Sequence, residues 1–230
     1  METALHKAIE LIFSGSALLE DIVWVTVRMS LASSLTALLI GVPFGVLFGS
    51  GSFPGKRILV VINRTLMGLP PVVCGLLCYL MFCGVGPLRH LELLYTVTVM
   101  VLAQIILITP IVIGMMEPFV SGIYPDIRET ARGMGISRIK TLGLLINESR
   151  YQIFSTYLMA LSRALAEVGA VSMVGGAIAY KTNVMTTAIM NFTNMGNFTT
   201  ALALGIILLA GSLVINAAVS LMQGRAQTWC

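Results

Sequence analysis

Long apolar runs, separated by short polar stretches, dominate the chain. Within each run the apolar residues are continuous rather than alternating with polar ones, which is typical of membrane-spanning helices and not of barrel strands. Five runs reach the ~20 residues that a helix needs to cross the hydrocarbon layer. They lie at about 22–48, 65–85, 93–116, 153–177 and 201–222. The pattern predicts an all-α, polytopic membrane helix bundle with about five transmembrane helices.

The composition points to the same environment. Hydrophobic residues make up 57% of the 230 positions and charged residues 10%, with a mean hydropathy of +0.93. Soluble domains carry about 25% charged residues, so this composition excludes a water-soluble enzyme. The four cysteines and two histidines have no spacing typical of a metal site, and we expect no metal and no cofactor in this chain.

The fourteen Lys and Arg residues are unevenly divided between the two sides of such a bundle. Only Lys7, Arg89 and Lys181 flank the spans on one side. Nine lie on the other side: Lys56, Arg57, Arg64, Arg128, Arg132, Arg138, Lys140, Arg150 and Arg225. The loops of membrane proteins that face the cytoplasm are enriched in Lys and Arg. The excess of basic residues on one side therefore indicates which side faces the cytoplasm rather than nucleic-acid binding.

This charge distribution predicts on which side of the membrane each segment lies. It places the N-terminus outside and the C-terminal tail 223–230 in the cytoplasm, together with the hydrophilic loop 117–150. We expect the outer segment 1–21 to form a short interfacial helix rather than a sixth span. Residues 22–222 then form the membrane domain.

Prolines interrupt two of the predicted spans. Pro70 and Pro71 lie early in the second and Pro110 lies in the third. Each removes a backbone hydrogen bond and bends a helix. The kinks are either packed against neighbouring helices or border a water-filled path through the bundle.

The loop 117–150 is the only substantial hydrophilic region of the sequence. Asp126 is predicted to cap a helix whose first turn holds Glu129, and Gly135 to end it. Ser137 is predicted to cap a second short helix. Two helices joined by a glycine turn would project from the bilayer as a compact knob.

This knob resembles the cytoplasmic loop of permease subunits of ABC importers, which reads Glu-Ala-Ala, three residues, Gly, nine residues, Ile-x-Leu-Pro. Glu129-Thr130-Ala131, three residues and Gly135 match its first half. Thr130 replaces an Ala, and the expected Ile, Leu and Pro are replaced by Leu145, Asn147 and Glu148. The segments 52–57 with 68–75, and 162–170, are similar to molybdate, tungstate and sulfate permeases, most of all to the tungstate branch.

The resemblance implies a homodimer of type I permease subunits in the inner membrane of a prokaryotic cell. It also implies a pair of separate ATPase subunits, which bind ATP and Mg²⁺, and an extracytoplasmic oxyanion-binding protein. The sequence has no Gly-x-x-x-x-Gly-Lys-Ser/Thr phosphate loop, so it is not itself the ATPase. In the family the Glu-Ala-Ala helix fits a groove on the ATPase. That role falls on Glu129, Thr130, Ala131 and Gly135, with Arg132 and Arg138 as flanking contacts.

Two charged residues lie within the fourth predicted span. A charge near the middle of a span costs about 2.5–3.5 kcal/mol or more, and Arg163 and Glu167 are spaced i, i+4, so they can neutralise each other on one helix face. We expect a structural ion pair. The alternative is a direct contact between Arg163 and the transported anion.

The sequence thus predicts the permease of an oxyanion importer, most similar to tungstate permeases, with molybdate or sulfate as alternative substrates. A small ion channel or a membrane-embedded enzyme is the alternative from another class. No paired carboxylates facing one site and no selectivity sequence support either of these. We therefore assign no catalytic residue.

Overall fold

The computed structural model describes residue 10 and residues 17–227, and within them all regular structure is helical. The elements are α2 (Ala17–Ser50), α3 (Lys56–Met67), α4 (Pro71–Phe82), the 3₁₀ helix η1 (Arg89–Leu91), α5 (Val97–Gly133), α6 (Arg138–Glu148), α7 (Arg150–Leu165), α8 (Gly169–Gly175), α9 (Met185–Asn194) and α10 (Phe198–Gln227). The predicted all-α membrane bundle is confirmed.

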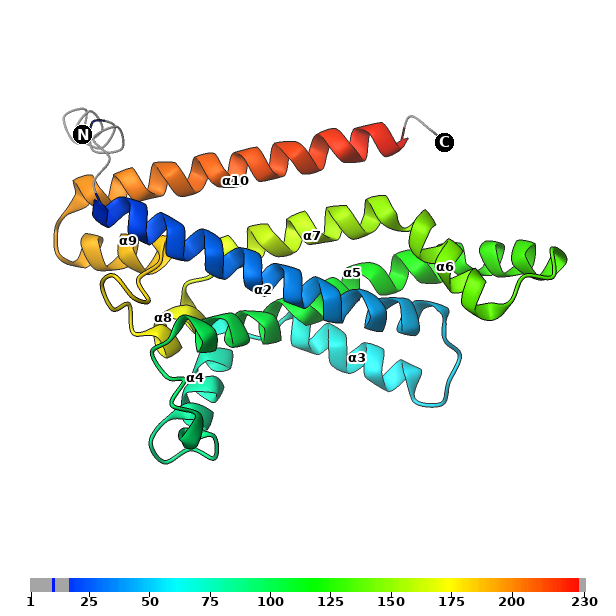
Figure 1. Cartoon of the computed structure of the whole chain (residues 1–230), viewed down its shortest axis with the longest axis horizontal. Helices are drawn as coiled ribbons and strands as arrows, with labels where there is room; N and C mark the ends of the chain where they lie inside the picture. Colours follow the sequence, from blue (N-terminus) through cyan, green and yellow to red (C-terminus); the bar gives the residue numbers. More distant parts are fainter. Residues whose placement is uncertain (1–9, 11–16, 228–230) are drawn as a thin grey trace.

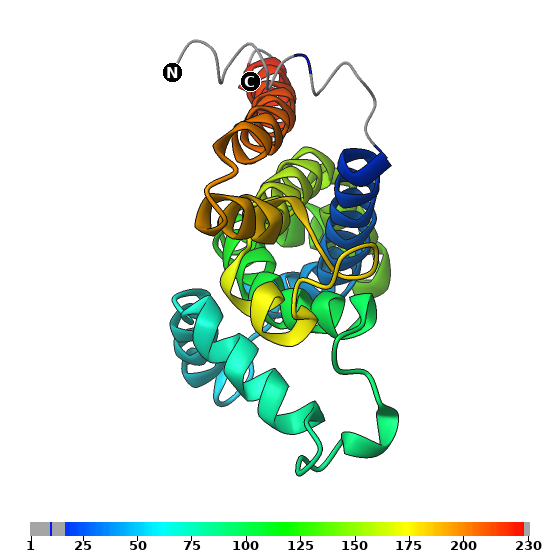
Figure 2. The ribbon, with the colours of Figure 1, turned by 90° about the vertical axis from the view of Figure 1, so that its left-hand side faces the viewer.

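The molecule is elongated, with α2, α5, α7 and α10 along its long axis (Figure 1). At one end α5 turns into α6; we call this the elbow end. The opposite end, where α8 and α9 lie, is the α9 end. Seen from the α9 end, α10 lies on one side of the bundle and α3 and α4 project on the other (Figure 2).

The helices α2 and α5 pack side by side and run in the same direction. A Cβ atom on Gly41 would lie 2.6 Å from Val112 Cγ1, and one on Gly45 would lie 2.5 Å from Met116 Cβ. Each contact joins residues 71 positions apart, a constant offset that defines parallel helices in register. Small residues every four positions let the backbones approach, which is how membrane helices gain packing contacts without a hydrophobic driving force.

The described chain contains three helices long and apolar enough to cross a membrane, or up to five crossings if two bent helix pairs count as one each. The long helices are residues 19–50, 97–133 and 198–217. The predicted fifth span, 201–222, thus corresponds to α10. The short helix α9 lies between the second bent pair and α10.

The second and fourth predicted spans are not single helices. The axes of α3 and α4 differ by 99°, and those of α7 and α8 by 57°. Pro70 is the N-cap of α4 and Pro71 its first residue, where the missing N–H costs no hydrogen bond. These prolines therefore begin a helix instead of kinking one. Pro110, in contrast, is buried within a continuous α5.

The predicted helix start at Asp126 is wrong, because α5 continues without a break from Val97 to Gly133. Pro118 and Pro125 lie within it and are both exposed. They are seven residues apart and so share a face, where the carbonyl groups that they leave unbonded can be solvated. Polarity at Glu117 marks a change of environment and not the end of the helix.

The structure describes only part of the predicted N-terminal segment 1–21. Residues 1–9 and 11–16 lie outside the described residues, so the interfacial helix stays a prediction. Residues 17–21 are the first turns of α2.

Candidate functional site: the α5–α6 elbow and the broken spans

The elbow is closed by a glycine turn. Gly135 has φ +66°, a left-handed conformation that costs other residues energy. Its N–H donates to the carbonyl of Arg132 (3.1 Å), and the N–H of Ile136 donates to that of Ala131 (2.8 Å). These two bonds form a Schellman motif, which satisfies carbonyls left free at the helix end. Gly135 ends the first helix of the elbow, as predicted.

The inner side of α6 packs against α5. Ser137 is at its N-cap, as predicted, but its side chain makes no capping bond. Leu145 is fully buried in a hydrophobic cluster that includes Val120, Ile123 and Ile127 of α5. Within the first turn of α6, the Thr141 hydroxyl donates to the Ser137 carbonyl (3.0 Å). On the outer side Ile139 is 83% exposed.

The predicted coupling residues differ in their exposure. Ala131 is buried, whereas Glu129, Thr130 and Arg132 are exposed. For Arg138 only the helical backbone is described. We call Glu129, Thr130, Arg132 and Ile139 the rim. It combines exposed charged, polar and apolar side chains, which is the composition of a protein interface.

A polar hollow of about 310 Å³ lies between the elbow and the end of α2. Arg128 and Arg132 line it from α5, and Ser52 lines it from the segment after α2. The elbow therefore presents the guanidinium groups of Arg128 and Arg132 to this hollow.

The ion pair expected in the fourth span is present but spans a break. Arg163 Nη2 lies 3.2 Å from Glu167 Oε2, with side chains 39% and 4% exposed. Because α7 ends at Leu165, the two residues do not share one helix face. The second carboxylate oxygen accepts the N–H of Ala170 (3.1 Å), and the carbonyl of Glu167 accepts the Thr186 hydroxyl (2.8 Å). The buried charge is thus paired and fixes the geometry of the break.

The two broken spans meet each other. A Cβ atom on Gly169, at the start of α8, would lie 3.5 Å from Pro71 Cβ and 2.9 Å from Val72 Cγ2. A Cβ atom on Gly75 would lie 2.8 Å from the Ala170 Cα. The predicted kink residue Pro71 is therefore packed beside the break that carries Glu167. Pro110 lies elsewhere, against α3.

Sequence reasoning missed the amide groups that tie these spans to α5. Gln104 is fully buried; its Oε1 accepts the Ser33 hydroxyl (2.6 Å), and its Nε2 donates to the Ala164 carbonyl (2.9 Å). Asn63 Nδ2 donates to the Pro110 carbonyl (3.0 Å). Gln104 thus joins α2, α5 and α7, and Asn63 joins α3 to α5. The available signal was a lone amide in an apolar run, which marks a helix contact in membranes.

Residues 41–227 match the family described as the binding-protein-dependent transport system inner membrane component. The chain belongs to this family. The match covers both broken spans and the elbow, so the predicted resemblance to permease subunits of ABC importers is confirmed.

Several similar proteins are transport permeases. The chain is 32% identical to the tungstate uptake system permease protein TupB of Peptoclostridium acidaminophilum, over 95% of this chain and 96% of that protein. It is 36% identical to a probable anion ABC transporter permease of Haloferax volcanii (86% and 88% covered). A sulfate transport system permease, CysT of Escherichia coli, is 25% identical (86% and 76% covered).

The fold is that of a known transporter. An inward-facing structure of the MetNI methionine ABC transporter superposes with a TM-score of 0.69 at 18% identity, covering 90% of this chain and 95% of that one. The chain is therefore a membrane-embedded permease component of an ABC importer. Family membership favours this function over the ion channel and the membrane-embedded enzyme.

Proposed function

We propose that this permease component imports tungstate and that its α5–α6 elbow couples it to a separate ATPase. The similarity to TupB over 95% of this chain carries the choice of substrate. Molybdate and sulfate remain the alternatives, and the sulfate permease CysT of Escherichia coli matches at 25% identity.

The elbow end would face the cytoplasm and the α9 end the outside. This orientation is supported by the basic residues of the elbow end, among them Lys56, Arg57, Arg128, Arg132 and Lys140. The ATPase, which binds ATP and Mg²⁺, would then contact the rim formed by Glu129, Thr130, Arg132 and Ile139. The hollow lined by Arg128 and Arg132 would accept an acidic side chain of the ATPase. The oxyanion-binding protein would dock at the α9 end.

A second copy of the chain would complete the transport path. Its contact surface is proposed on α3 and α4, because both helices project from the bundle with exposed apolar side chains (Figure 2). These are Ile58, Val61, Ile62 and Leu66 on α3 and Val72, Leu76, Leu77 and Leu80 on α4.

The described contacts supply a route from the elbow to the breaks. The 37-residue α5 is one continuous helix from the elbow to the α9 end. A tilt imposed at the elbow would reach α7 through Gln104 and α3 through Asn63. Both contacts lead to the place where α4 and α8 meet, and we place the gate there. The Arg163–Glu167 pair would hold the break without presenting a free cation that traps a dianion.

The test is uptake by vesicles containing the permease, its ATPase and the cognate binding protein. Glu129→Lys reverses a rim charge, and Gly135→Val forces a β-branched residue into the left-handed region. Both variants should hydrolyse ATP with little tungstate uptake while remaining folded. Gly122→Val, at an exposed glycine of α5 with open space around it and outside the proposed ATPase contact, is the matched control and should retain uptake. Normal uptake by both elbow variants would refute the coupling role.

Competition decides the substrate in the same vesicles. Unlabelled tungstate should suppress uptake at lower concentration than molybdate, and sulfate should compete weakly. Transport of sulfate equal to that of tungstate would rule out a tungstate permease.

A further inference from the structure

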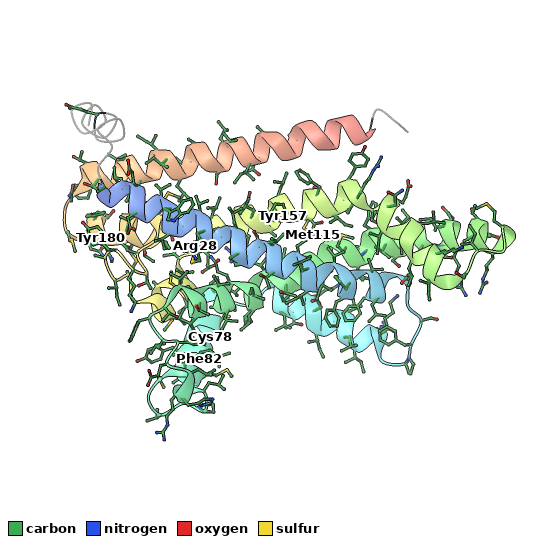
Figure 3. All side chains as sticks on the ribbon, viewed as in Figure 1. Arg28, Cys78, Phe82, Met115, Tyr157 and Tyr180 are labelled. Atoms are coloured by element: carbon green, nitrogen blue, oxygen red, sulfur yellow. The ribbon has the colours of Figure 1, made fainter. Side chains whose placement is uncertain are left out.

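At the α9 end, a hollow of about 540 Å³ lies between α2, the start of α5 and the loop that carries Lys181. Its walls differ sharply in character. Asp21, Arg28 and Lys181 line it with charged side chains, whereas Val25, Ala32, Val97, Val101 and Leu102 line it with apolar ones. Figure 3 labels Arg28 on α2 and Tyr180, the neighbour of Lys181, toward this end. The hollow therefore fits a molecule with a charged head and an apolar body.

The depth of Arg28 relative to the membrane follows from the register of α2 and α5. The apolar part of α5, residues 97–116, is about 30 Å long, the thickness of the hydrocarbon layer. The constant offset of 71 places Val97 level with Thr26 and Val99 level with Arg28. Arg28 thus lies at the boundary of the apolar layer, where lipid phosphates begin. Trp24, 65% exposed and one turn nearer the end, has the position of an interfacial indole.

The charges in this hollow lack partners in the part of the chain that the structure describes. Asp21 Oδ2 is buried without a hydrogen-bond donor. Neither Arg28 nor Lys181 forms an ion pair with a described carboxylate. A buried carboxylate oxygen without a donor is costly, and two cations at a membrane boundary attract an anion. The hollow thus offers complementary sites for an ammonium group and a phosphate group.

We propose that this hollow binds a phospholipid whose headgroup carries both a phosphate and an ammonium with N–H donors. The phosphate lies between Arg28 and Lys181, and the ammonium donates to the carboxylate that Asp21 contributes to the lining. The acyl chains lie on Val101 and Leu102. The transported oxyanion fits less well, because Asp21 repels a dianion and much of the lining is apolar. The site depends only on the membrane boundary and not on the substrate or on which end faces outside.

Native mass spectrometry of the purified permease with equal amounts of dioleoyl phosphatidylethanolamine, phosphatidylcholine and phosphatidylglycerol tests the site. Choline has no N–H donor and phosphatidylglycerol has no cation. The wild type should retain phosphatidylethanolamine over the other two by about tenfold, the effect of one hydrogen bond to a charged group. Asp21→Asn should abolish the preference over phosphatidylcholine. Arg28→Gln with Lys181→Gln should reduce retention of all three lipids.

Matched controls come from the same end of the molecule. Glu20→Gln changes the exposed neighbour of Asp21, and Arg89→Gln removes an exposed cation outside the hollow; both should retain lipids like the wild type. Equal retention of the three lipids by the wild type, or an unchanged preference in Asp21→Asn, would overturn the proposal. A cross-link between copies through Trp24→Cys, in a chain with Cys230→Ser, would also overturn it, because a second copy would then cover the hollow.

Discussion

Replacing Gln104 by Leu removes the amide that joins three helices while keeping a side chain of similar size. Two hydrogen bonds are lost, to the Ser33 hydroxyl and to the Ala164 carbonyl. Hydrogen bonds between membrane helices average about 0.6 kcal/mol and reach about 1.7 kcal/mol. We therefore expect Gln104→Leu to lower the free energy of unfolding by about 1–3 kcal/mol. The measurement is unfolding of the purified protein in mixed detergent micelles, followed by circular dichroism.

Two serines on α2 provide the matched comparison. Ser33 and Ser30 are both fully buried, but the Ser30 hydroxyl has no hydrogen-bond partner in the described chain. Ser33→Ala should cost about 0.6 kcal/mol, and Ser30→Ala should be neutral or stabilising. In a chain already carrying Gln104→Leu, Ser33→Ala should cost much less. Equal losses from the two serine variants, or a Gln104→Leu protein as stable as the wild type, would refute the reasoning.

Two further changes test the packing and the break. Gly45→Val places side-chain atoms where a Cβ atom alone would lie 2.5 Å from Met116 Cβ, so it should destabilise the protein by about 1–3 kcal/mol or more in the same unfolding assay. Gly122→Val, with open space around it on α5, should cost far less; similar losses would disprove the close approach. Arg163→Gln should destabilise the protein by leaving the buried Glu167 charge unpaired, and adding Glu167→Gln should recover part of the loss in thermal unfolding. A double variant less stable than Arg163→Gln alone would contradict this.

The approximate places of the apolar segments follow from hydropathy, because lipid permits little besides a helix for a long apolar run. The bends do not follow from it. Gly68-Leu69-Pro70 is apolar enough to belong to a span, and the second break, around Ala166, contains no proline at all. The mean hydropathy of a segment says how apolar the segment is, but it carries no information about the direction of the helix axis. Both broken spans were therefore predicted as single helices.

Features that depend on one residue or on short spacing could be predicted from the sequence, whereas hydrogen bonds between distant segments could not. Gly135 could be assigned to a helix end because the left-handed conformation is a property of one residue. The partners of Gln104 are 71 and 60 residues away in the chain, and nothing local identifies them. Glu167 was correctly paired with Arg163, since their spacing is short. Its bonds to Ala170 and Thr186 depend on the fold.

The parallel pairing of α2 and α5 decides how many times the chain crosses the bilayer. The first ends at the elbow end and the second starts at the α9 end, so the bent pair α3–α4 must carry the chain back across. The same holds for α7–α8 between α5 and α10. Neither pair is therefore a re-entrant loop, and the described residues cross the bilayer five times, an odd number. Deleting any one of them would invert everything that follows, and reporters fused to the two ends of the chain should be found on opposite faces of the membrane.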